Sequence, residues 1–68
     1  MKFYGTFGFG QVKEGKYVEI DAKTREEAHE KMFEAFDDKW SFLYNEKGWM
    51  VNDKTQAEEY HLIKLQNL

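Results

Sequence analysis

The strongest structural signal in this chain is the helix pattern of residues 24–36. Thr24 and Glu27 have the spacing of a capping box, in which two side chains satisfy free N–H groups at the start of a helix. Apolar residues then recur about every 3.6 positions, at Ala28, Met32, Ala35 and Phe36, with Phe33 beside them. A lone amphipathic helix buries its apolar stripe against another element. The flanking segments are therefore expected to supply a sheet.

The segments before the helix predict a β-hairpin. Residues 2–9 and 16–21 are rich in aromatic and β-branched residues, which favour strands. Residues 13–15 end in a glycine that suits a turn. Alternation along the two strands predicts that Tyr4 and Tyr17 point away from the helix. The side chains expected in the core are Phe3, Phe7, Phe9, Val18 and Ile20.

The second half of the chain predicts shorter elements. They are a strand at 40–44, a turn at 45–48, a strand or packed loop at 49–51, a short helix at 55–60 and a strand at 61–66. The helix at 55–60 rests on Thr55 and Glu58, which repeat the capping-box spacing. The expected fold is one α+β domain spanning residues 1–68. Its order is β-β-α-β(-α-β), with one amphipathic helix packed on a small antiparallel sheet.

Composition excludes several classes of protein. The 68 residues include no cysteine, which rules out disulfide scaffolds and thiolate chemistry. No apolar run approaches the roughly 18 residues of a membrane span. The N-terminal residues lack a signal-peptide pattern, so we expect a cytoplasmic protein that does not contact membranes.

The residues also argue against an enzyme, a cofactor site or a metal site. Residues 10–16 match the spacing of a phosphate-binding loop, but Tyr17 replaces the required serine or threonine, and a strand follows. We interpret them as the hairpin turn. His29 and His61 are the only histidines and are read as exposed polar residues. No nucleophile motif or catalytic constellation is present. We therefore expect a non-enzymatic protein without cofactors.

Nucleic-acid binding is considered and not favoured. Residues 8–12 partly match the aromatic strand of RNA-recognition domains. The net charge, however, is −3, and seven of the 13 acidic residues lie between residues 21 and 38. Nucleic-acid binders carry a basic patch instead.

Two features favour a protein partner. The first is an acidic helix edge, made by Glu26, Glu30, Glu34, Asp37 and Asp38. Such charge speeds encounter with a basic partner, although a merely solvated face is the alternative. The second is a surplus of aromatic rings, 12 in all, from which we expect Tyr4, Tyr17 and Trp49 to anchor a partner. The alternatives are that residues 49–60 cover these rings, or that a homodimer does.

Several stretches together resemble a group of small proteins encoded by phages and prophages of Gram-positive bacteria. The resemblance covers residues 2–44. It lies in Phe3–Gly8 with Gln11, Tyr17–Ala22, Glu27-Ala28, Met32-Phe33 and Lys39–Tyr44. It implies a phage accessory protein in the host cytoplasm, in a setting that includes inhibitors of host defence such as anti-CRISPR proteins. The expected function is to bind and modulate a host or phage protein. The alternatives are a single-stranded nucleic-acid-binding module that uses sheet aromatics, and a phage structural or assembly component.

Overall fold

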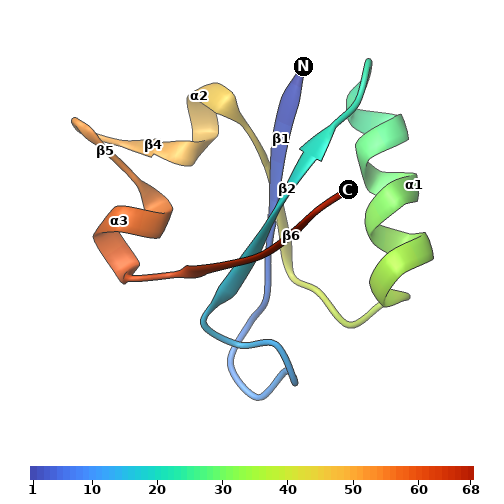
Figure 1. Ribbon diagram of the computed structural model, residues 1–68, viewed down its shortest axis with the longest axis horizontal. Coiled ribbons are helices and arrows are strands. Elements are labelled where there is room, and N and C mark those ends of the chain that lie inside the picture. Colours follow the sequence, from blue (N-terminus) through green and yellow to red (C-terminus); the bar gives the residue numbers. More distant parts are fainter.

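A four-stranded mixed sheet forms the centre of the computed structural model, which describes all of residues 1–68 (Figure 1). The order across the sheet is β3-β1-β2-β6. β1 is antiparallel to β2 and β3, whereas β6 is parallel to β2. The elements are β1 (Lys2–Thr6), β2 (Lys16–Asp21), α1 (Arg25–Phe36), β3 (Phe42–Asn45), α2 (Glu46–Trp49), β4 (Met50–Val51), β5 (Lys54–Thr55), α3 (Gln56–Tyr60) and β6 (Ile63–Asn67). The α+β class is confirmed.

The β1–β2 hairpin is confirmed, with Phe3 opposite Ile20 and Thr6 opposite Tyr17. The first strand is shorter than predicted, because the chain leaves the sheet after Thr6 and forms a loop up to Gly15. Gly15 has a φ of +82°, which suits a glycine at this turn. The prediction that Phe9 faces the core is wrong, since Phe9 lies in this loop and is 97% exposed.

α1 begins where the sequence predicts. The Thr24 hydroxyl accepts a hydrogen bond from the Glu27 backbone N–H at 3.2 Å. Ala28 and Met32 are fully buried against the sheet. Together with residues from β1, β2 and β3, and with Phe7 and Ala22 just after the first two strands, they form the main core. It consists of Phe3, Phe7, Val18, Ile20, Ala22, Ala28, Met32 and Leu43. This core lies entirely between α1 and the sheet.

Residues 46–62 form a second layer on the opposite face of the sheet, which we call the lobe (Figure 1). The predicted turn at 45–48 is instead the start of α2, because the Asn45 side chain caps the Gly48 N–H at 2.7 Å. β4 and β5 form a short antiparallel pair. α3 begins with the predicted capping box of Thr55 and Glu58. The sheet is thus covered by α1 on one side and by the lobe on the other.

The last strand is confirmed, but its direction corrects the prediction of an antiparallel sheet. β6 runs parallel to β2, with Lys16 opposite Ile63 and Glu19 opposite Asn67. The lobe carries the chain from β3 to the far edge of the sheet, where β6 enters in the same direction as β2 (Figure 1). No helix is both long and apolar enough to cross a membrane.

Candidate protein-binding surfaces

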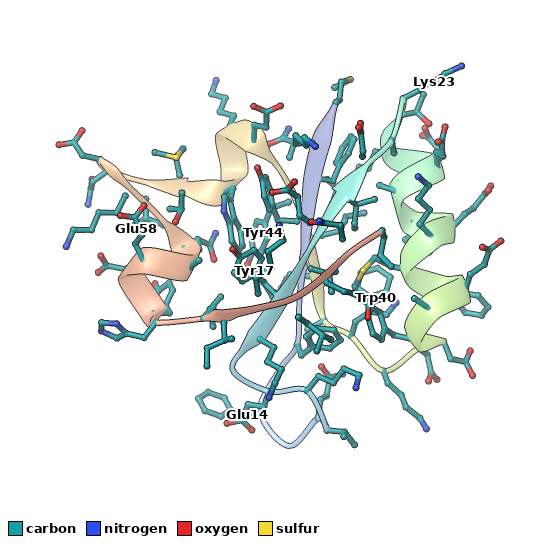
Figure 2. All side chains as sticks on the ribbon, viewed as in Figure 1. Glu14, Tyr17, Lys23, Trp40, Tyr44 and Glu58 are labelled. Atoms are coloured by element: carbon teal, nitrogen blue, oxygen red, sulfur yellow. The ribbon has the colours of Figure 1, made fainter.

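The acidic residues of α1 lie on its exposed side. Glu26, Glu30 and Glu34 are all exposed, and Figure 2 shows carboxylate-tipped side chains pointing away from the sheet along this helix. The two basic residues of α1 do not neutralise them. The Arg25 guanidinium donates to the backbone oxygen of Leu43, and Lys31 Nζ donates to that of Asp21, both at 2.7 Å. The carboxylates of this edge therefore remain without ion pairs.

All ion pairs of the protein lie elsewhere. They join the N-terminus, Lys2 and Lys64 to Glu19 and Asp21. The acidic edge extends past the end of α1 through Asp37 and Asp38, which are exposed. The last turn of α1 holds no basic residue. Acidic groups at this end oppose the helix dipole by a few tenths of a kcal/mol each, so fold stability does not explain their presence.

One apolar side chain interrupts the acidic edge. Phe33 is 54% exposed, and it lines a shallow hollow with His29, Glu30 and Glu34. We call Glu26, Glu30, Phe33, Glu34, Asp37 and Asp38 the acidic surface. The acidic surface thus combines carboxylates that form no ion pair with one exposed aromatic ring.

The aromatic residues predicted to anchor a partner occupy a different environment. Trp49 is only 4% exposed. Its ring stacks on Tyr4 with centroids 4.6 Å apart and an interplanar angle of 7°, and it also contacts Tyr17 and Tyr44 at 5.1 and 5.8 Å. Figure 2 shows Tyr17 and Tyr44 between the sheet and the lobe. Trp49 is therefore a packing residue of the lobe, which corrects its predicted role.

Tyr4 and Tyr17 are half-buried beneath Trp49. The alternative in which residues 49–60 cover this face of the sheet thus describes the arrangement better than open rings do. Burial raises the pKa of the Tyr4 hydroxyl, and the carboxylates of Glu19 and Glu46 raise it further. Lys2 Nζ lies 3.3 Å from Glu19, and this contact together with Asp21 raises the lysine pKa.

A second group of aromatic rings, separate from Trp49 and its three tyrosine neighbours, is exposed to solvent. Phe9, Phe42 and Tyr60 are 97%, 60% and 63% exposed, and they line one hollow of about 460 Å³. The hollow lies between the hairpin loop, β3 and the end of α3. We call it the aromatic hollow; its lining residues are Phe7, Gly8, Phe9, Glu14, Gly15, Phe42, Tyr60 and Leu62.

Sequence reasoning missed this hollow because it placed Phe9 inside a strand. The signal that was available is the pair of glycines on either side of it, Gly8 and Gly10, which weaken a strand. Gly10 has a φ of +82°, a conformation that favours glycine and suits the loop after β1.

Both histidines are exposed, as predicted, and they lie in separate elements. The His29 ring meets Trp40 edge-on at 5.2 Å, and His61 ends α3 in the left-handed conformation. Residues 10–16 form the hairpin loop and the first residue of β2, as predicted.

The chain has no match among protein-family models, curated proteins or solved structures.

Proposed function

We propose that this chain is a non-enzymatic phage accessory protein that binds a host or phage protein and modulates it. The observation that carries the proposal is the aromatic hollow, where three large rings surround one depression and are each at least 60% exposed. Fully burying a phenylalanine side chain is worth about 1.5–3 kcal/mol. A partner that covers these rings removes their exposed apolar surface from water, which supports binding at this hollow.

The acidic surface indicates what kind of partner is favoured. Its carboxylates have no intramolecular ion pairs, so their field extends into solvent. A basic protein surface is attracted to it, and acidic partners are rejected. A host protein that normally holds nucleic acid presents such a basic surface. Inhibition of a host defence protein is consistent with both this charge and the resemblance to phage accessory proteins.

The alternative of single-stranded nucleic-acid binding loses its main support. That reading needs Tyr4 and Tyr17 open on the sheet, where bases stack on them. Trp49 occupies this position, with its ring 4.6 Å from that of Tyr4. The unpaired carboxylates of α1 also repel a phosphate backbone. Both observations favour a protein partner over single-stranded nucleic acid.

Capture from a lysate of a Gram-positive host tests the proposal. We expect the wild-type chain to retain a specific protein, and the double variant Phe9→Ser, Phe42→Ser to lose it. The variant Glu30→Lys, Glu34→Lys is expected to weaken capture in a salt-dependent manner. Met50→Ser and Glu59→Lys are matched controls, because both residues are exposed and lie outside the two surfaces.

Two outcomes contradict the proposal. One is capture of the same proteins by the wild type and by both double variants. The other is tight, salt-sensitive binding of single-stranded oligonucleotides that is lost in Tyr4→Ala, which would establish the nucleic-acid alternative. Circular dichroism of each variant confirms that its fold is retained.

A further inference from the structure

The aromatic hollow contains one charged group, and that group is negative. Glu14 lines the hollow together with the rings of Phe9, Phe42 and Tyr60. No lysine, arginine or histidine lines it. Two lysines lie near Glu14 in the sequence, Lys13 and Lys16; both are half-buried, and neither lines the hollow. The hollow therefore combines the faces and edges of aromatic rings with an uncompensated carboxylate.

The Glu14 carboxylate is held in position by the backbone. Its Oε1 accepts a hydrogen bond from the Gly10 N–H at 2.8 Å, which spans the loop that also carries Phe9. No ion pair involves Glu14. Oε2 therefore stays available to a donor that enters from outside. Figure 2 shows Glu14 at the loop end of the hairpin, away from α1 and its acidic surface.

We infer that the aromatic hollow binds an arginine side chain of a partner protein. This inference rests on the proposed protein-binding function and names the chemistry that the site recognises. A guanidinium is weakly hydrated and planar, stacks on aromatic faces and donates hydrogen bonds to a carboxylate. The hollow offers both contacts together: rings for the plane and Glu14 Oε2 for an N–H donor. A volume of about 460 Å³ accommodates such a side chain with part of its backbone.

Charge and shape favour this occupant over an aliphatic one. A leucine or isoleucine side chain would cover the rings, but it would shield Glu14 Oε2 from water without offering it a donor, which is costly. A lysine ammonium would meet the charge, but it is more strongly hydrated and lacks the planar stack. Arginine satisfies the rings and the carboxylate at once.

The test uses short peptides of glycine and serine that carry one central residue: arginine, lysine, citrulline or leucine. Binding is followed by NMR chemical shifts of the full chain, which separate the hollow from the acidic surface. We expect the arginine peptide to shift the signals of residues 7–15, Phe42 and 60–62. Citrulline has nearly the same shape without the charge, and we expect it to bind at least about fivefold more weakly, because it lacks the cationic attraction to rings and carboxylate.

Three variants locate the contact. Phe9→Ala and Glu14→Gln are each expected to weaken arginine binding about two- to fivefold, which corresponds to one exposed cation–π or ionic contact. Both positions are exposed, so the fold tolerates the changes. Glu59→Gln removes an exposed acid of α3 that does not line the hollow, and it is expected to leave binding unchanged.

Equal binding of arginine and citrulline, or shifts confined to α1, would overturn the inference. Stronger binding of leucine would do the same and would assign the hollow to an apolar side chain. The proposed function fails separately, if the lysate experiment yields no protein whose capture depends on Phe9 and Phe42. Capture that depends on these rings, combined with no preference for arginine, would leave the proposed function standing and remove only this inference.

Discussion

Trp49 gives the most informative single substitution, because it joins the lobe to the sheet. Its side chain is 4% exposed and contacts three tyrosine rings, with the closest stack at 4.6 Å on Tyr4. Replacing a buried tryptophan with alanine costs about 3–5 kcal/mol. A single core of this size supplies roughly 3–5 kcal/mol of net stability. Trp49→Ala is therefore expected to bring the protein to the edge of unfolding at 25 °C.

Urea denaturation followed by circular dichroism measures this effect. Trp49→Phe keeps a ring over Tyr4 and is expected to lose clearly less stability than Trp49→Ala. Met50→Ala, at the next residue, is a matched control, because Met50 is 47% exposed. Trp40 remains as a fluorescent reporter on the α1 side of the molecule in every variant. Comparing Trp40 fluorescence with circular dichroism shows whether the α1 layer and the lobe unfold together.

The refuting result is a loss below about 0.5 kcal/mol for Trp49→Ala, which is the range of surface substitutions. The lobe would then not cover Tyr4 and Tyr17 in solution. The sheet face would be open, and both rings would again be candidates for contact with a partner or with nucleic acid.

Three further predictions concern stability. A methyl group at Gly5 would lie 2.6 Å from Met32 Sδ. Gly5→Ala is therefore expected to destabilise the protein by about 1–2 kcal/mol, although alanine loses less backbone entropy on folding than glycine does. Urea denaturation should show a smaller cost of Gly5→Ala in a Met32→Ala background. Thr24→Ala removes the cap on the Glu27 N–H and should cost about 1 kcal/mol by the same assay; no loss would argue against the cap. The folded state holds the Tyr4 proton more tightly than the unfolded chain does. The resulting contribution to the free energy of unfolding is present below the ordinary pKa of 10.0 and is lost as the pH rises through the raised pKa. Denaturation at pH 9 to 11 should show a shallower decline for Tyr4→Phe, and equal slopes would contradict this reasoning.

The local elements of the fold were predictable because short-range signals determine them. Thr24 and Thr55 each begin a helix through spacing that is visible in the sequence. Val18 and Ile20 alternate with Tyr17 and Glu19, and this period places the first pair in the core. In these segments, propensity, capping and hydrophobic pattern all agree with the tertiary structure.

The arrangement of the second half was not predictable from such signals. The direction of β6 depends on how far the lobe carries the chain, and no local pattern encodes that distance. Trp49 lies beside a segment too short to classify, so its burial depends on a long-range stack with Tyr4. Phe9 was misplaced because alternation was extended beyond Thr6, where glycines end the strand. Of the candidate sites, the acidic surface followed from helix spacing, whereas the aromatic hollow required residues from three elements.

The parallel pairing of β2 with β6 has a consequence for the order in which the protein folds. β1 and β2 are neighbours in the chain, so their pairing closes only a short loop. β6 reaches β2 after more than 40 intervening residues, and closing this larger loop costs more chain entropy. We therefore expect the hairpin and α1 to form the folding nucleus, and β6 to dock in the final step. Because the lobe lies between β3 and β6 in the chain, its placement and the completion of the sheet are a single late event.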